Sequence, residues 1–102
     1  MSACPRVAYF CMEYGLDPSF PIYAGGLGIL AGDHMKSVGD LNAPVTGVGL
    51  LWDEGYTRQV VGAGGNTLED QYPKTNREPV RRIDARVDVT VRGKTIPLRA
   101  WK

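Results

Sequence analysis

The apolar positions in the first half of this chain form two short continuous runs that flank one periodic segment. Residues 7–12 and 45–51 are almost wholly apolar, which is typical of strands buried on both faces. Between them, apolar side chains recur every three or four residues over 26–41, which predicts an amphipathic helix ending near Asn42. Strand, helix and strand over about 7–51 predict a βαβ unit whose two strands are parallel.

The second half of the chain, about 56–102, follows a different pattern that is rich in expected strands. Residues 56–61 are typical of a strand, and the glycines of 62–66 predict a flexible turn. Residues 68–79 contain two prolines and predict an irregular connection.

Alternation of polar and apolar side chains is strictest near the end of the chain. Residues 86–92 and 95–101 both alternate, and Gly93 and Lys94 are expected to turn the chain between them. This pattern predicts a β-hairpin. Val87, Val89 and Val91 are expected to share one face of the first strand. In the second strand, Ile96, Leu98 and Ala100 are expected to point inward.

The predicted elements do not make a complete α/β fold. A two-stranded parallel sheet with one helix leaves one sheet face uncovered, whereas parallel sheets normally have both faces buried. We therefore expect residues 1–102 to be part of a single α/β domain at the front of a longer protein.

Composition argues against several classes of partner. The apolar content of 43% and the charged content of 23% are ordinary for a globular protein. The net charge of +1 gives no overall attraction to nucleic acid or to anionic lipid. The charge is uneven, however: residues 1–73 hold three basic and eight acidic side chains (−5), and residues 74–102 hold nine basic and three acidic ones (+6).

Other features of the sequence predict a cytoplasmic protein. No apolar run approaches the roughly 20 residues that span a bilayer, and the first residues lack the long apolar core of a signal peptide. Cys4 and Cys11 are too few for a disulfide framework and lack metal-ligand spacing, which fits a reducing compartment and predicts no metal site.

The glycine-rich turn just before the predicted helix is the main candidate site. Gly25, Gly26 and Gly28 fall within four residues, where the unpaired amides of a helix N-terminus can hold an anion. The alternative is that glycine only permits close packing. Packing can account for Gly28 and Gly32, one turn apart in the helix, but it does not easily explain Gly25 and Gly26.

A dinucleotide site is the second hypothesis, in which the chain is a stand-alone nucleotide-binding module. Residues 26–31 fit the G-x-G-x-x-A fingerprint, and Asp53 follows the second strand as a ribose-binding acid would. The fingerprint requires glycines immediately after the first strand, however, and here about nine loop residues intervene. A non-catalytic remnant without a ligand is a third option.

The remaining polar residues give weaker indications. Glu13 leaves the C-terminal end of the first strand, where it could either reach a bound hydroxyl or brace the glycine loop. His34 and Asp33 are neighbours in the helix and point about 100° apart, so a helix histidine with local hydrogen bonds is favoured over a catalytic pair. No catalytic triad, acid–base pair or metal cluster can be assembled from the sequence. Six arginines over 77–99 lack interleaved aromatics and favour a solvated sheet face, or one docked on an acidic partner, over a nucleic-acid site.

Four segments, in order, resemble the N-terminal region of α-glucan phosphorylases, relatives of glycogen phosphorylase, and especially the shorter bacterial and archaeal type. They are residues 7–15 (VAYFCMEYG), 21–34 (PIYAGGLGILAGDH), 48–51 (VGLL) and 54–56 (EGY). The resemblance implies a GT-B glycosyltransferase in which residues 1–102 form part of the Rossmann-like N-terminal domain, with one βαβ unit followed by a β-hairpin region.

The resemblance also implies the chemistry. Such enzymes transfer a glucosyl unit from an α-1,4-glucan or maltodextrin to orthophosphate, which releases glucose 1-phosphate with retention. They carry pyridoxal phosphate on a lysine. The loop matching Gly25, Gly26, Leu27 and Gly28 contacts the substrate phosphate and glucose through backbone N–H groups, and Glu13 is assigned to the same substrate-binding set.

Some residues depart from the family pattern. Cys11 stands where the family usually has serine, and Ala24 stands where it has serine or asparagine. Asn42 stands where it has glycine. The cofactor lysine and the basic phosphate-binding residues belong to the family's C-terminal domain, and Lys36 does not match the cofactor position. We therefore expect the isolated chain to be inactive and to need that domain, and the family permits a homo-oligomer.

Overall fold

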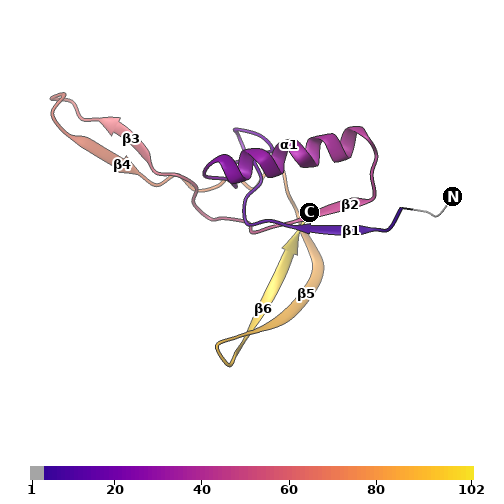
Figure 1. Cartoon of the computed structure of the whole chain (residues 1–102). Helices are drawn as coiled ribbons and strands as arrows, with labels where there is room; N and C mark the ends of the chain where they lie inside the picture. The colour runs from indigo at the N-terminus through magenta and orange to yellow at the C-terminus, as the bar shows by residue number, and fades with distance from the viewer. Residues whose placement is uncertain (1–3) are drawn as a thin grey trace.

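The computed structural model describes residues 4–102. The prediction that the chain has no signal peptide concerns its first residues, of which 1–3 lie outside the described part. Residues 4–102 contain one helix and six strands, and the strands pair into three separate two-stranded sheets (Figure 1). In chain order the elements are β1 (Val7–Phe10), α1 (Gly26–Asp40), β2 (Val45–Val48), β3 (Arg58–Val61), β4 (Leu68–Gln71), β5 (Arg82–Val91) and β6 (Lys94–Trp101).

The helix α1 agrees with the apolar spacing of the sequence. It begins at Gly26 and ends at Asp40, with Leu41 at its C-cap. Asn42 follows with a φ of 49°, the left-handed conformation that commonly ends a helix. The prediction of a helix that ends near Asn42 is confirmed.

The strands β1 and β2 are parallel neighbours, as predicted, and α1 packs against one face of their sheet. Tyr9 pairs with Gly47 in the register, and both face the helix. The Tyr9 ring meets His34 edge-on, with 5.3 Å between ring centroids. A Cβ placed on Gly47 would lie 3.3 Å from the Met35 Cε atom.

The hydrophobic core lies between α1 and the loop that follows β1. The buried apolar residues of the described chain are Tyr14, Phe20, Ile22 and Ala31. The Tyr14 hydroxyl donates hydrogen bonds to the carbonyl oxygens of Tyr9 and Val48, which ties the loop to both strands. Burial raises the pKa of the Tyr14 hydroxyl, which therefore stays protonated as a donor.

The prediction that both parallel strands are buried on two faces is wrong. Phe10 is 74% exposed, and Val7 and Val48 are also exposed. Side chains alternate between the faces of a strand, so Phe10 and Val48 point away from α1. Val7 shares the face of Tyr9 and is still 46% exposed, so α1 covers that face only in part. Within residues 4–102, no second layer covers the opposite face.

The strands β3 and β4 form an antiparallel arm, so the predicted irregular connection is wrong for residues 68–71. Leu68 is followed by Glu69, Asp70 and Gln71, a polar run without the alternation that signals a strand. This strand forms because the turn at 62–67 returns the backbone to β3, with the Gly62 amide bonded to the Thr67 carbonyl at 2.7 Å.

The strands β5 and β6 form the predicted hairpin, although β5 begins earlier than expected, at Arg82, with a register shift before Arg86. Arg92 and Gly93 make the two-residue turn, one position before the expected one, and have φ of 50° and 76°. The prediction that Ile96, Leu98 and Ala100 point inward is wrong for Ile96 and Leu98, which are exposed, and Ala100 is half-buried. Val87 and Val91, which were predicted to share one face, are exposed as well.

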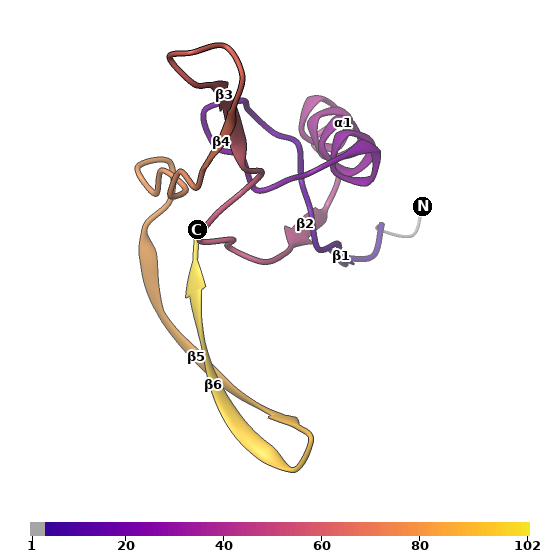
Figure 2. The same cartoon turned by 90° about the vertical axis from the view of Figure 1, so that its left-hand side faces the viewer.

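The molecule is extended, with principal extents of 66 × 38 × 25 Å. We call α1, the β1–β2 sheet and the loop between β1 and α1 the α1 unit. The β3–β4 arm and the β5–β6 hairpin project from this unit in different directions (Figures 1 and 2). The hairpin lies on the side of the β1–β2 sheet opposite α1. In residues 4–102 no helix has the length and apolar character needed to cross a membrane.

Candidate functional site

The glycine-rich segment forms the N-terminal end of α1. Gly25 is the N-cap residue in an extended conformation, and no side chain caps the helix. The first amides of a helix have no partner within the helix. Among residues 4–102, no acceptor is bonded to the amides of Gly26, Leu27 or Gly28. These three donors therefore lack an acceptor within the described chain; Gly26 and Leu27 are exposed, whereas Gly28 is buried. The dipole at a helix N-terminus also favours an anion.

Glu13 braces the residues immediately before the helix. One of its carboxylate oxygens, Oε2, accepts hydrogen bonds from the Ala24 amide at 3.0 Å and the Gly25 amide at 3.3 Å. Of the two roles considered for Glu13, the structure shows the brace. Because the Gly25 amide is engaged by this carboxylate, the donors left free begin at Gly26.

The glycines of this segment divide into two groups. A Cβ on Gly28 would lie 2.5 Å from the Tyr23 Cβ, and a Cβ on Gly32 would lie 2.1 Å from the Gly15 carbonyl oxygen. Close packing therefore accounts for both. By contrast, a Cβ on Gly26 would meet nothing within 4 Å, and one on Gly25 would approach only the Tyr56 hydroxyl, at 3.8 Å. The fold itself does not require glycine at 25 or 26.

A shallow pocket of about 240 Å³ adjoins the glycine loop. Glu13, Tyr23 and Ala24 line it on the loop side, and Trp52 and Tyr56 line it from the segment after β2. The Trp52 indole Nε1 donates to the Met12 carbonyl at 2.8 Å, which holds the two sides together. Tyr56 belongs to the segment 54–56 that carries the family resemblance, but neither Tyr56 nor Trp52 was predicted to line a site. The available signal was their position after β2, at the same sheet edge where Glu13 follows β1.

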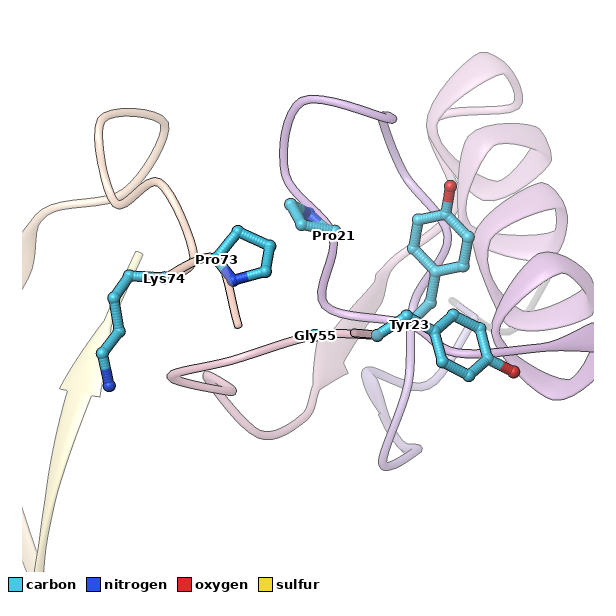
Figure 3. A pocket seen from close by; sticks show the side chains of 6 residues that line it. Pro21, Tyr23, Gly55, Pro73 and Lys74 are labelled. Carbon is cyan, nitrogen blue, oxygen red and sulfur yellow. The ribbon is translucent and has the colours of Figure 1, made fainter. Parts of the chain in front are cut away.

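A second pocket of about 220 Å³ shares part of this lining and extends to Pro73 and Lys74 (Figure 3). Pro21 and Tyr23 approach it from the loop before α1, and the Lys74 side chain extends away from Tyr23 (Figure 3). Gly55 and Tyr56 belong to both pockets, so the two hollows form one continuous depression beside the glycine loop.

Lys74 and Arg77 link this depression to the segment after β2. The Lys74 ammonium lies 2.6 Å from an Asp53 carboxylate oxygen and 2.8 Å from a Glu54 oxygen, and an Arg77 nitrogen lies 3.1 Å from Asp53. The hydrogen bond and charge of Lys74 lower the pKa of Asp53, and the hydrogen bonds that Lys74 donates to Asp53 and Glu54 raise the pKa of Lys74. Asp53, the ribose-binding acid of the dinucleotide hypothesis, is thus engaged by two cations.

The other sequence candidates do not join the site. His34 is exposed and packs against Tyr9, and within the described residues it makes neither a hydrogen bond to Asp33 nor the local hydrogen bonds that were expected. Arg77 is 5.3 Å from the centroid of the Trp101 ring, a cation–π contact that ties the hairpin to the body of the molecule.

The residues of this chain do not fit a pyridoxal phosphate site. A Schiff base requires a lysine amine that can lose its proton inside a pocket. Among residues 4–102, Lys74 alone of the lysines lines one of these pockets, and two carboxylates hold it in its charged form. No step of the chemistry is assigned to such a cofactor on this chain.

Comparison with known proteins relates this chain to an enzyme family. A maltodextrin phosphorylase of Thermococcus litoralis is 50% identical over 72 residues, which cover 71% of this chain and 8% of that protein. A glycogen phosphorylase of Mycobacterium tuberculosis is 52% identical over 59 residues, which cover 58% of this chain and 7% of that protein. The resemblance to the α-glucan phosphorylases is confirmed.

The match to phosphorylases is local relative to their length. The chain spans less than a fifth of each curated relative described here. An uncharacterized protein of Methanocaldococcus jannaschii is 37% identical over 95 residues, which cover 93% of this chain and 18% of that protein. No protein-family model matches the chain, and no solved structure matches it significantly.

Proposed function

We propose that this chain supplies the glycine-rich substrate loop of an α-glucan phosphorylase, as part of the Rossmann-like N-terminal domain of a GT-B glycosyltransferase. The reaction is transfer of a glucosyl unit from an α-1,4-glucan or maltodextrin to orthophosphate, which gives glucose 1-phosphate. The names of the relatives support the reaction class, and the parallel β1–β2 pair beside α1 is compatible with such a domain.

The observation that carries the proposal is the contrast between the two groups of glycines. Gly28 and Gly32 are packed against protein atoms, whereas an added Cβ at Gly26 would enter open space next to free amides. Glycine costs up to roughly 1 kcal/mol relative to alanine within a helix. Open space alone does not distinguish Gly26, because Gly39 in the last turn also meets nothing within 4 Å; Gly26 differs in lying beside helix amides that have no acceptor. Close approach of a ligand to the backbone gives a reason for glycine at that position.

In this proposal the chain binds and orients substrate and does not provide the acid. The amides of Gly26, Leu27 and Gly28 donate to the phosphate or sugar oxygens, and their fixed orientation needs no rearrangement when charge develops. Glu13 holds Ala24 and Gly25, which sets the angle at which the chain enters α1. The cofactor and the basic groups that share the phosphate charge belong to residues outside this chain.

The proposal predicts that Gly26→Ala weakens the binding of inorganic phosphate without disturbing the fold. The expected loss is about tenfold, equivalent to roughly one hydrogen bond to a charged group. Amide chemical shifts of the isotope-labelled chain, titrated with inorganic phosphate, measure the affinity. Gly39→Ala is the matched control, because its added Cβ also meets nothing within 4 Å and lies in the last turn of the same helix.

Two outcomes would contradict the proposal. One is phosphate affinity in Gly26→Ala equal to that of the native chain and of Gly39→Ala. The other is a preference for nicotinamide or flavin nucleotides at micromolar concentration, which would favour the nucleotide-binding alternative. The proposal also expects no glucose 1-phosphate from the isolated chain incubated with glycogen, phosphate and pyridoxal phosphate.

A further inference from the structure

The depression beside the glycine loop lies at the base of the β3–β4 arm. Tyr56 precedes β3 and Lys74 follows β4, so the two ends of the arm both contribute to its lining. The chain is joined across this base. The Thr75 amide donates to the Asp53 carbonyl at 2.7 Å, and Glu54 pairs with Lys74 in an isolated β-bridge. The wall of the depression on the arm side is therefore held by backbone contacts.

Aromatic and proline rings form most of the lining of this depression. They are Pro21 and Tyr23 from the loop before α1, Trp52 and Tyr56 from the segment after β2, and Pro73 from the segment after β4. Figure 3 shows Pro73 on one side and Pro21 and Tyr23 on the other. Tyrosine and tryptophan offer an apolar ring face together with a polar edge, so this lining suits a ligand that has both apolar faces and hydroxyl groups.

The charged groups of the depression compensate one another. Lys74 is the one cation that lines it within residues 4–102, and its ammonium is bound to the carboxylates of Asp53 and Glu54. The Glu13 carboxylate accepts two backbone amides. An anionic ligand would have to displace carboxylates from Lys74, whereas the same carboxylates can accept hydrogen bonds from hydroxyl groups. The charges therefore favour a neutral ligand with several hydroxyl groups.

The shape of the depression favours a short chain of rings. It consists of two connected shallow hollows of about 240 and 220 Å³, each smaller than the pockets of about 300–1,000 Å³ that enclose drug-sized ligands. Gly55 and Tyr56 line both hollows and so stand where the two meet. A sugar ring presents C–H groups on its faces and hydroxyl groups around its edge. Consecutive sugar rings suit two adjoining hollows with aromatic lining.

The Tyr56 side chain connects the depression to the start of α1. A Cβ placed on Gly25 would lie 3.8 Å from the Tyr56 hydroxyl oxygen, and Gly25 is the N-cap of the helix. The amides without an acceptor begin at the next residue, Gly26. A ligand in the depression would therefore end beside the amides to which the proposed function assigns phosphate.

We propose that this depression binds glucosyl units of the α-1,4-glucan chain, with the ring of Tyr56 stacked on one of them. The inference rests on the proposed function and adds the residues that hold the glucan rather than the phosphate. A planar aromatic compound such as a nucleoside is the competing occupant, because it stacks on the same rings. The observations favour the sugar, whose hydroxyl groups can donate to the Glu13 and Glu54 carboxylates of the lining.

The test is titration of the isotope-labelled full chain with maltotriose, an α-1,4-linked trisaccharide of glucose, followed by nuclear magnetic resonance. The two indole N–H groups of the chain are the reporters. Trp52 lines the depression, whereas Trp101 ends β6 and lines neither hollow. The Trp52 resonance should shift on addition of maltotriose and the Trp101 resonance should not. The affinity should be equal at low and high salt, because a neutral ligand is insensitive to charge screening.

Three variants separate the ring of Tyr56 from its hydroxyl group and from general effects. Tyr56→Ala should weaken maltotriose binding about tenfold, because the stacking face is lost. Tyr56→Phe keeps the ring and should bind within about threefold of the native chain. Tyr72→Ala is the matched control and should bind as the native chain does. Tyr72 is 61% exposed, compared with 69% for Tyr56, but it follows β4 outside the lining.

Several outcomes would overturn the inference. They are a Trp52 resonance that does not move in the native chain, native-like binding by Tyr56→Ala, equal losses in Tyr56→Ala and Tyr72→Ala, and tighter binding of adenosine than of maltotriose at Trp52. Far-UV circular dichroism verifies that each variant keeps the native secondary structure.

Failure of this inference and failure of the proposed function are distinguishable in the same sample. Phosphate that shifts the amides of Gly26 to Gly28, with no effect of maltotriose on Trp52, supports the proposed function and overturns the glucan site. Maltotriose that shifts Trp52 in a chain whose Gly26 to Gly28 amides ignore phosphate supports the glucan site and argues against the phosphate loop.

Discussion

The α1 unit and the β5–β6 hairpin differ in how they are stabilised. All of the buried apolar residues within 4–102 fall between Tyr14 and Ala31, where the loop after β1 packs on α1. The hairpin is longer than any other pair of strands, yet no residue of β5 or β6 is buried. Its order comes from backbone pairing, a favourable two-residue turn and the contact between Arg77 and Trp101.

This difference separates the part of the chain that has a hydrophobic core from the part that is exposed. The candidate site lies in the part that has its own core, so the glycine loop and Glu13 are held without further protein. The hairpin and the face of the β1–β2 sheet opposite α1 carry exposed apolar side chains such as Ile96 and Phe10. Substitutions in the two regions should therefore have unequal effects on the isolated chain.

The largest expected difference comes from the same truncation made in each region. Ile22 is 8% exposed and Ile96 is 41% exposed. Ile22→Ala should lower the free energy of unfolding by about 2–5 kcal/mol, because it removes core contacts and leaves a cavity. Ile96→Ala should change it by less than about 0.5 kcal/mol. Urea unfolding followed by circular dichroism measures both, and equal losses would contradict the contrast between the regions.

A smaller effect is expected from adding one methyl group within α1. Gly32→Ala places a Cβ against the backbone of Gly15, and overpacking of this kind typically costs about 1–3 kcal/mol. Gly39→Ala meets nothing and should gain up to about 1 kcal/mol from helix propensity. Thermal melting of the two variants provides the comparison. If Gly32→Ala were as stable as the native chain, the close contact of α1 with the loop at Gly15 would be refuted.

The smallest effect is expected from the ion pairs that Lys74 and Arg77 make with the carboxylates of residues 53 and 54. The pKa of Asp53 is lowered in the folded state, so its contribution is present above its unfolded pKa near 3.9 and is lost as pH falls through the lower folded value. The pKa of Lys74 is raised, so its contribution is present below about 10.4 and is lost as pH rises through the higher folded value.

Amide chemical shifts of residues 53–54 and 74–77 should therefore be constant between these limits and change beyond them. The stability change should be small, because the groups are exposed and screened by salt. Asp53→Asn should weaken the acidic transition and leave only what the contact of Glu54 with Lys74 contributes. A transition of unchanged size in that variant would contradict the role given to Asp53.

The sequence was sufficient for the elements whose signals are local. Apolar spacing and Asn42 predicted α1 closely, and the two apolar runs around it predicted a parallel pair. Alternation with a glycine turn predicted the hairpin. The glycines near the start of α1 indicated where a site could lie, although only the structure distinguishes Gly26, in open space, from Gly32, packed on Gly15.

The features that sequence reasoning missed depend on contacts distant in the chain. The polar strand β4 forms because β3 is beside it, not because of its own pattern. The burial of β1 was predicted wrongly because an apolar run does not reveal whether a covering layer is present. The contact of Lys74 with Asp53 spans 21 positions, and no local motif announces it.

The position of a bound anion tests the central claim most directly. A crystal of the chain grown with inorganic phosphate should show the phosphate within about 2.7–3.2 Å of the amide nitrogens of Gly26, Leu27 and Gly28. The Ala24 and Gly25 amides should still donate to Glu13. Amides of Gly26 to Gly28 that instead donate to carbonyl oxygens of the protein would contradict the account.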